Sequence, residues 1–461
     1  MASTTTAFNK LPIELNKEIV GHLECDKDIR TFQKICRATF YAIDGDQMSF
    51  WRKKFRETYD LGPGRDVDNL MLKKLYQRRS VVLDRGRKIP FDNGEEKTEI
   101  KILRALRGLI NESFQGGGHG YDEYGRPQCP NQKHLESFAL SSKLFRNFKH
   151  LISLGAKRNI QPALSAVQLM CTHFLFEVDE EKRFKWDIFP FDISQQTVYT
   201  ETSKEALYTG PTKTQVNMLW MLHCVNFFRN HMIWEQTATL YRTFRDLEPG
   251  QKPSPWQGAL QTGCYPLSKH WKGTYSFLEI DELVQLRASP ADDDFVFMDK
   301  NVDEGNIQSL TLDFAKPGEE FKWPRLFEQH LDSFRLGLQT RTRAQHRAQP
   351  MIAESVGIQF SGQGDDNDHF YARGWLNPLP PQPLGCEIPG WQRITFMKYF
   401  LDSANHIETD ALWAYEGVVL PGGRIILGRW WYAEDPTVEN SGPFIFWAVD
   451  PEPEVVDLTD D

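Results

Sequence analysis

Hydrophobic and polar positions follow a helical pattern through the first half of the chain. From Leu11 to Phe55, apolar residues recur every three or four positions, and breaks near residues 24–27 and at Gly45 divide this stretch. The pattern therefore predicts a compact bundle of three short helices. From residue 56 to residue 250 it stays mostly helical. The expected helices of that region are Asn69–Val82, Glu99–Phe114, His134–Leu154, Pro162–Phe176 and Thr214–Phe244.

The pattern changes after a cluster of prolines at Glu248–Pro255. Beyond it, short runs are rich in β-branched and aromatic residues, which are typical of strands. A tight turn is expected at Leu420–Arg424. Many short strands with turn signals between them predict an antiparallel β-barrel or a sandwich. The expected strands are Phe277–Leu286, Asp294–Met298, Ile307–Phe314, Gly357–Phe360, Gln392–Phe400, Leu412–Leu420, Arg424–Tyr432 and Phe444–Val449, interrupted by a helix at Leu326–Gln349.

Together these patterns predict an α+β fold with five segments. Residues 1–10 are expected to form a flexible N-terminus, residues 11–55 the three-helix bundle, and residues 56–250 a helical linker domain. Residues 256–450 form the expected β-rich, barrel-like domain. Residues 451–461 are acidic and contain two prolines, so we expect a disordered tail.

Composition and charge narrow the classes of protein to consider. The chain has 461 residues, of which 40% are hydrophobic and 25% charged, as in a folded protein, and its net charge of −9 argues against a general nucleic-acid binder. No apolar run reaches the 18 or so residues that a membrane span needs. The first ten residues lack the apolar core of a secretory signal. We therefore expect a protein of the cytoplasm, the nucleus or both, with no nucleic acid and no membrane among its partners.

The residues give no support for a catalytic or metal site. The seven cysteines are far apart and include no CxxC pair, so we expect free thiols instead of a zinc site or a disulfide framework. The run Asp365–His369 lacks the glycine and the distal glutamate of a calcium-binding loop. His223, Cys224 and His231 are expected to belong to the core of an apolar helix. No cofactor, no metal and no catalytic residue is predicted.

The N-terminal helical stretch carries the most specific pattern of the sequence. The motif LPIEL begins at Leu11, with proline before the first helical turn and an acid within that turn, and Ile19 and Leu23 continue its apolar face. A second helix follows, and Trp51 closes the segment. A bundle of this size cannot bury all of its apolar surface alone. Part of that surface is therefore expected to meet a partner or the rest of the chain.

This segment resembles the F-box motif over residues 11–55. The resemblance implies docking onto the adaptor Skp1, which links F-box proteins to a cullin and a RING protein. It therefore implies the substrate receptor of an SCF-type ubiquitin ligase, which performs no chemistry itself. The residues expected to bind Skp1 are Leu11, Pro12, Leu15, Ile19, Leu23, Ile29, Phe32, Ile35, Cys36 and Trp51.

The C-terminal half carries a second resemblance. The blocks Gly385–Tyr399, Tyr415–Trp431 and Gly442–Trp447 are similar to blocks in fungal F-box proteins. The segment Trp271–Tyr275 is similar to the opening strand of the lipocalin-like barrels found in some F-box receptors. The resemblance implies that this domain binds the protein substrates of the ligase, which are as yet unidentified.

Arginine and tryptophan residues lie close together in the sequence of this β-rich domain. Guanidinium groups beside aromatic faces could form a peptide-binding cleft, through cation–π and carboxylate contacts. The same residues could instead pack the barrel and cap its rim. Packing is the expected role of most of them, with one or two lining a cleft. The candidate substrate contacts are Trp271, Tyr275, Trp391, Arg393, Arg424, Arg429 and Trp430.

The acidic tail contains a candidate SUMO-interacting motif. Val455, Val456 and Leu458 form an extended aliphatic run beside acidic residues, as in peptides that add a strand to a partner's sheet. SUMO is therefore a further candidate partner. The alternative is a solubilising tail whose aliphatic residues bind nothing.

Two other functions remain open from the sequence. The barrel could hold a small ligand or an active site, with the F-box-like segment used for the protein's own turnover. A deep apolar pocket with a few polar groups would favour that hypothesis. Alternatively, the segment could belong to a scaffold that acts outside ubiquitin ligation and binds the adaptor without a cullin.

Overall fold

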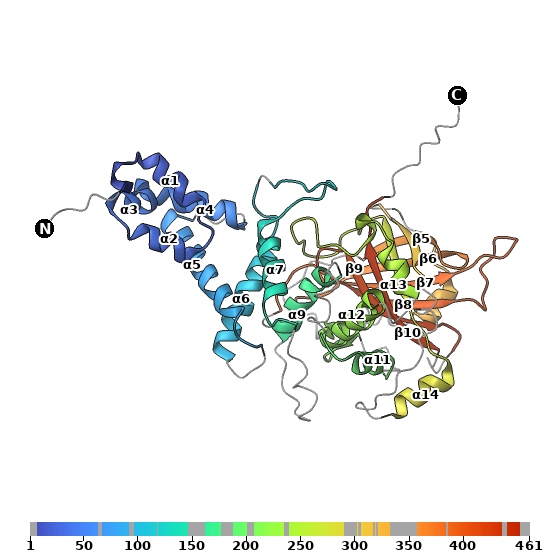
Figure 1. Cartoon of the computed structure of the whole chain (residues 1–461). Coiled ribbons are helices and arrows are strands. Elements are labelled where there is room, and N and C mark those ends of the chain that lie inside the picture. The colour runs from blue at the N-terminus through green and yellow to red at the C-terminus, as the bar shows by residue number, and fades with distance from the viewer. Residues whose placement is uncertain are drawn as a thin grey trace, which may run out of the picture. The chain divides into compact units, whose positions relative to one another are not determined.

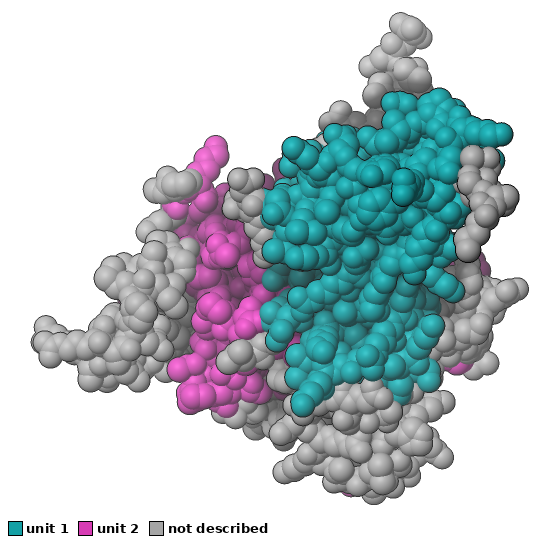
Figure 2. Space-filling view, turned by 90° about the vertical axis from the view of Figure 1, so that its left-hand side faces the viewer, with its two compact units in different colours: residues 1–147, 257–259 teal, residues 148–256, 260–461 magenta. Residues whose placement is uncertain are grey.

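The computed structural model divides the chain into two compact units. Unit 1 comprises residues 1–147 and 257–259, and unit 2 comprises residues 148–256 and 260–461 (Figure 1, Figure 2). The division falls within residues 56–250, so helices of the predicted linker domain belong to both units. The structure describes residues 7–62, 67–91, 96–117, 119–145, 162–176, 188–200, 207–234, 239–289, 302, 306–316, 319, 321–331, 357–383, 386–435 and 440–451.

Four short helices form the N-terminal part of unit 1, where the pattern predicts three. Their bounds, with two 3₁₀ turns, are η1 Ala7–Lys10, α1 Ile13–Gly21, α2 Asp26–Gln33, α3 Arg37–Asp44, η2 Asp46–Met48 and α4 Ser49–Thr58. The turn η1 lies within the predicted flexible N-terminus. Its Phe8 ring packs edge-on against Phe32, with ring centroids 5.2 Å apart, so this end of the segment is held by an apolar contact.

Three longer helices follow in the described part of unit 1. They are α5 Asn69–Gly86, α6 Glu96–Glu112 and α7 Pro130–Ser141. Asp68 caps α5, because its side chain accepts a hydrogen bond of 2.7 Å from the backbone amide of Met71. The predicted helix His134–Leu154 ends earlier, at Ser141, and its residues beyond 145 lie outside the described part of the chain.

Asp44 connects the helices of unit 1. Its carboxylate accepts hydrogen bonds from Gln33 Nε2 (2.6 Å), Trp51 Nε1 (2.9 Å) and Lys73 Nζ (2.7 Å). These donors belong to α2, α4 and α5, so one carboxylate at the end of α3 joins four helices. Because Asp44 is only partly exposed, these donors compensate its carboxylate for the hydration that it loses.

Unit 2 begins with a helical layer. Outside the barrel, the helices and short strands in the described part of unit 2 are α9 Pro162–Cys171, η3 Thr172–Leu175, α11 Phe191–Thr200, β1 Tyr208–Thr209, β2 Gln215–Val216, α12 Met218–Ile233, α13 Thr239–Arg245, η5 Pro249–Gln251, α14 Ile280–Ala288 and α16 Arg325–His330. The predicted helix Thr214–Phe244 is therefore divided. Asn217 starts α12 after β2, because its side chain accepts a hydrogen bond from the amide of Trp220.

Eight antiparallel strands of unit 2 close into a barrel, and this confirms the barrel predicted for the C-terminal half. Each strand pairs with the next one in the sequence, and β10 pairs with β3 to close the ring. The closing register places Phe446 opposite Gly273. The strands are β3 His270–Tyr275, β4 Gln308–Phe314, β5 Ile358–Asp365, β6 His369–Pro378, β7 Gln392–Tyr399, β8 Trp413–Val419, β9 Ile425–Tyr432 and β10 Ser441–Ala448.

Some elements of the β-rich region differ from the prediction. Most of the predicted strand Phe277–Leu286 forms helix α14, because Glu279 and Glu282 make a capping box at its start. The pattern does not predict β6, because Arg373 and Gly374 interrupt its run of apolar and aromatic residues. Of the predicted helix Leu326–Gln349, α16 covers the first residues, and residues 332–349 lie outside the described part. The predicted strand Asp294–Met298 also lies outside it.

The turn expected at Leu420–Arg424 is present between β8 and β9. Gly422 and Gly423 have φ angles of 89° and 68°, in the left-handed region that favours glycine. The Leu420 amide donates a hydrogen bond of 2.9 Å to the carbonyl oxygen of Ile425. The glycine pair therefore sets the register of this hairpin.

Aromatic rings fill the described interior of the barrel, next to glycines on neighbouring strands. A Cβ atom added at Gly273 would overlap the Phe446 ring, and one at Gly364 would lie 2.6 Å from Phe370. The interior core also includes Trp271, Phe360, Ile394, Phe396, Tyr415, Trp430 and Phe444. The described strands therefore enclose a packed core.

Helices α11 and α12 pack on the outside of the barrel at β9 and β10. The Cys224 thiol of α12 donates to the carbonyl oxygen of Phe444 at 3.7 Å. All eight residues of β10, and all but the last of β9, are buried. A strand that is covered on both faces needs apolar residues at nearly every position. This explains why apolar and polar residues do not alternate along β9 and β10.

Candidate functional site

Apolar side chains remain exposed along helix α1. Leu15 is 45% exposed and Ile19 is 38% exposed, and they lie one helical turn apart on the same face. Pro12 is exposed and Leu11 and Leu23 are partly exposed, just beyond the two ends of the helix. We call these five residues the α1 stripe. A row of exposed apolar side chains of this kind is typical of a site that binds another protein.

The neighbouring face of α1 fixes the helix to the bundle. Val20 is fully buried, and Asn16 Nδ2 donates to the carbonyl oxygen of Phe8 at 3.1 Å. At the C-terminal end of α1, Lys54 Nζ donates to the carbonyl oxygen of Gly21 at 3.0 Å, where a cation suits the helix dipole. Burial lowers the pKa of Lys54. These contacts hold α1 so that the α1 stripe points away from the core.

Exposed aromatic residues also lie on α3, and the sequence analysis did not include them among the candidate contacts. Phe40 is 46% exposed and Tyr41 is 56% exposed, and their rings meet edge-on at 5.8 Å. Helices α1 and α3 pack against each other. Spacing gave no signal for this pair, because the packing of α3 buries Ala42 and Ile43 in place of the larger aromatic side chains.

The structure places the other residues expected to bind Skp1 in two environments. Ile35 is 41% exposed, and Cys36 is partly exposed at the start of α3. Ile29 and Trp51 have no exposed surface, and Phe32 is only 7% exposed. These last three pack the interior of the bundle, so they have almost no surface left to bury against a partner. Their effect on docking would come through the shape of the helices that they support.

The aromatic residues considered as substrate contacts belong to the barrel's own packing. Trp271, Trp391 and Trp430 are each at most 3% exposed. Trp430 Nε1 donates to the carbonyl oxygen of Ser276 at 3.1 Å. Tyr275 is partly buried, and its ring centroid lies 5.7 Å from that of Trp430. The packing role therefore holds for these residues, because side chains so enclosed do not present a binding face.

Arg424 and Arg429 are also enclosed. Arg424 is 9% exposed and donates to Ser254 Oγ at 2.7 Å and to the carbonyl oxygen of Ala448 at 2.9 Å. Arg429 is 3% exposed and donates to Ser441 Oγ at 2.7 Å. Both guanidinium groups satisfy acceptors within unit 2, so they tie its segments together.

Arg393 forms a buried ion pair with Glu416 on the neighbouring strand. Its guanidinium carbon lies 4.9 Å from the centroid of the Tyr208 ring, and the Tyr208 hydroxyl donates to the carbonyl oxygen of Gly417 at 2.9 Å. Burial opposes the charge, but Glu416 and Tyr208 raise the pKa of Arg393 above its usual value. The cluster fastens β1 to β7 and β8.

A second enclosed pair joins Lys398 of β7 to Asp366. Lys398 Nζ lies 4.2 Å from the centroid of the Phe370 ring and 5.4 Å from that of Tyr275. Burial lowers the pKa of Lys398, and the carboxylate of Asp366 opposes this shift. Because the two charges compensate each other, the pair leaves no net charge among these rings.

Comparisons with known proteins give no relative: no family model, no curated protein and no solved structure matches the chain. Among the residues that the structure describes, no three His, Cys, Asp or Glu side chains are grouped to hold a metal ion. Within the same residues, no helix has the length and apolar character to cross a membrane. The tail residues Val455, Val456 and Leu458 lie outside the described part.

Proposed function

We propose that this protein is the substrate receptor of an SCF-type ubiquitin ligase and binds Skp1 through the α1 stripe. The observation that carries the proposal is a row of exposed apolar residues on the helix whose sequence resembles the F-box motif. Complete burial of an aliphatic side chain contributes on the order of 1.5–3 kcal/mol. Leu15 and Ile19 alone would therefore supply a substantial part of the adaptor's affinity.

In this role the protein performs no chemistry. Skp1 would connect it to a cullin and a RING protein, and the receptor would hold a target near the charged ubiquitin-conjugating enzyme. The acceleration then comes from proximity, because tethering raises the effective concentration of target lysines around the thioester.

We assign target binding to unit 2. The up-and-down order of its eight strands supports the likeness to lipocalin-like barrels, which share that order. Because the tryptophans and arginines first considered are enclosed, the contacts are expected on loops at the ends of the strands. Loops on a rigid scaffold commonly carry recognition.

The packing of the barrel favours this role over that of a small-ligand carrier. The Phe370 ring occupies the space that a side chain at Gly364 would need. The charge of Lys398 is compensated by Asp366. A carrier needs a cavity of several hundred Å³ with polar groups that converge on the ligand. The described interior is occupied by the protein's own rings.

The test is recovery of Skp1 by a variant with Leu15→Asp and Ile19→Asp. Both positions are exposed, so the fold should be kept while the α1 stripe becomes charged. We expect at least about a tenfold loss of Skp1 in pull-downs, since each buried carboxylate opposes docking by more than 1.4 kcal/mol.

Val81→Asp is the matched control, because Val81 is 51% exposed on α5 and lies outside the α1 stripe. It should recover Skp1 like the unchanged protein, and thermal unfolding should verify that both variants are folded. Equal Skp1 recovery by all three proteins would refute the proposal. Adding the cullin to the same assay separates a ligase receptor from a scaffold, since only the receptor carries the cullin along.

A further inference from the structure

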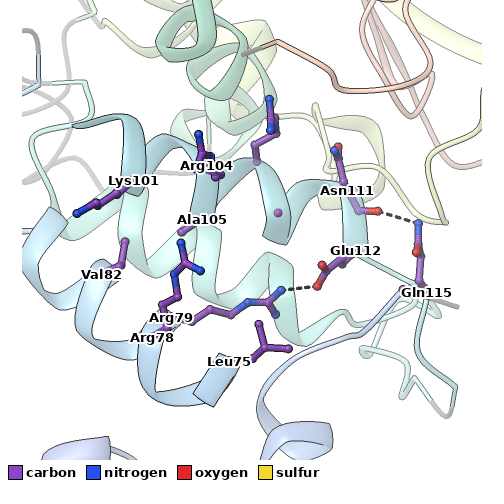
Figure 3. A pocket seen from close by; sticks show the side chains of 13 residues that line it. Leu75, Arg78, Arg79, Val82, Lys101, Arg104, Ala105, Asn111, Glu112 and Gln115 are labelled. Atoms are coloured by element: carbon purple, nitrogen blue, oxygen red, sulfur yellow. Dashed lines mark hydrogen bonds and ion pairs between the residues drawn. The ribbon is translucent and has the colours of Figure 1, made fainter. Parts of the chain in front are cut away.

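Helices α5 and α6 of unit 1, with Gly62 and Gln115, line a half-open cavity of about 610 Å³ (Figure 3). One helical face of α5 lines it, with Leu75, Arg78, Arg79 and Val82 at spacings of three and four residues. The facing side of α6 lines it with the same spacing. Its residues there are Lys101, Arg104, Ala105, Arg107, Gly108, Asn111 and Glu112. We call this cavity the basic groove.

Positive charge dominates the lining of the basic groove. Five cationic side chains and one carboxylate line it, although the whole chain carries a net charge of −9. Arg78, Lys101 and Arg104 are exposed, and among the described residues no carboxylate lies within ion-pair distance of any of them. Such charges on facing helices repel one another, so their arrangement is favourable once an anion lies between them.

Arg79 is a buried cation whose hydrogen bonds are not all made. It is only 8% exposed, and its guanidinium carbon lies 5.1 Å from the centroid of the Tyr59 ring. It reaches from α5 to Glu112 on α6 and pairs with that carboxylate (Figure 3). Its Nη1 atom is buried and has no hydrogen-bond partner. Arg79 lines the groove, and the unmade hydrogen bond of a buried charged group favours a ligand that supplies an acceptor to it.

Gly108 keeps the floor of the basic groove open. A Cβ atom at this position would meet nothing within 4 Å. Glycine within a helix destabilises it relative to alanine, and Gly108 has no close contact that requires it. Together with Ala105 it leaves room between the helices where larger side chains would fill the space.

We propose that the basic groove binds a small polyphosphate anion. A ligand that meets Arg78 and Arg79 on one wall and Lys101 and Arg104 on the other must carry more than one negative charge. Arginine binds phosphate oxygens in a bidentate manner, which suits the three guanidinium groups among these four. A cavity of 610 Å³ has the size of a small-molecule site. None of the residues that line the groove belongs to the α1 stripe, so binding here would be a function additional to the proposed docking of Skp1.

Calorimetric titration of the full-length protein with inorganic pyrophosphate and tripolyphosphate, at fixed ionic strength, tests this site. We expect saturable binding with one site per chain. Arg78→Gln together with Arg104→Gln should weaken it at least about tenfold, because two charge-assisted contacts are lost. Gly108→Leu should weaken it by a similar factor, since leucine fills the groove while every charge is kept.

Arg85→Gln is the matched control, because Arg85 lies on the same helix, is exposed and does not line the groove. It should bind like the unchanged protein, and thermal unfolding should establish that all variants are folded. Absence of saturable binding, or equal binding by the Gly108→Leu variant, would overturn the proposal. A phosphorylated peptide that binds where neither probe does would also overturn it, and would assign the groove to a protein ligand. None of these outcomes bears on Skp1 recovery.

Discussion

Individual charged side chains hold parts of unit 2 together with almost no access to water. Glu416 is 1% exposed and pairs with Arg393, whose side chain is 13% exposed. The exposed pair of Lys53 and Glu57 differs, with exposures of 79% and 49%. Loss of one partner in the buried pair leaves an uncompensated charge, whereas an exposed pair contributes little.

We expect Arg393→Met to lower the free energy of unfolding by about 3–5 kcal/mol, because Glu416 would then be buried alone. The double variant with Glu416→Leu should recover much of that loss. Lys53→Met, the matched control, should change the free energy by less than about 1 kcal/mol. Urea unfolding measures all three. A double variant as unstable as Arg393→Met would show that the pair is not what stabilises this site.

A buried histidine gives unit 2 a defined response to pH. His223 lies in α12, 6% exposed, with its ring stacked 3.9 Å from that of Phe189 and Nδ1 3.1 Å from Ser194 Oγ. Burial lowers the pKa of His223 from 6.5 to about 3. Between pH 6.5 and pH 3, His223 therefore binds a proton in the unfolded chain but not in the folded one. The stability due to the neutral ring is present above pH 6.5 and is lost as the pH falls toward 3.

The variant His223→Gln should respond less to acid than the unchanged protein. Between pH 6.5 and 4.5, the free energy of unfolding of the unchanged protein should fall more steeply, by up to about 1.4 kcal/mol per pH unit. Burial also lowers the pKa of His173, but His173 is present in both proteins, so its contribution cancels in the comparison. Parallel pH curves from urea unfolding would contradict the assignment to His223.

Among the helices and strands, those with regular spacing were predictable from the sequence. The helices α5 and α6 and the strands β7 to β9 lie within two or three residues of their predicted bounds at most ends. The start of α12 and the identity of α14 were not predicted, because side-chain caps at Asn217 and Glu279 decided them. The periodicity of apolar residues indicates which face of an element is buried, whereas the capping side chains determine where a helix begins.

The candidate sites were predictable only in part, for a related reason. Spacing identified Leu15 and Ile19 as one face of α1, but it could not tell that Ile29 and Trp51 would be enclosed by other helices of the bundle. Burial depends on which elements meet, and that information is tertiary. The basic groove was missed for the same reason, since the cations on α5 are more than twenty residues away in the chain from those on α6.

For the chain as a whole, the two activities proposed for the two units can be separated in cells. A protein with Leu15→Asp and Ile19→Asp should still bind targets through unit 2 but should no longer pass them to the ligase. Proteins captured with this variant should therefore accumulate several-fold over those captured with the Val81→Asp control. Quantitative mass spectrometry of the two captures measures this. Identical captured sets would show that target abundance does not depend on the α1 stripe.

The closure of the barrel also determines when this protein can finish folding on the ribosome. Strand β3 ends at Tyr275, but its closing neighbour β10 begins at Ser441, so roughly 170 residues must be translated between them. At roughly 5–20 residues per second, that takes on the order of 10–30 s. During this time one edge of β3 is unpaired, and an unpaired edge can recruit other chains. Nascent chains are therefore expected to depend on chaperones until the last strand emerges.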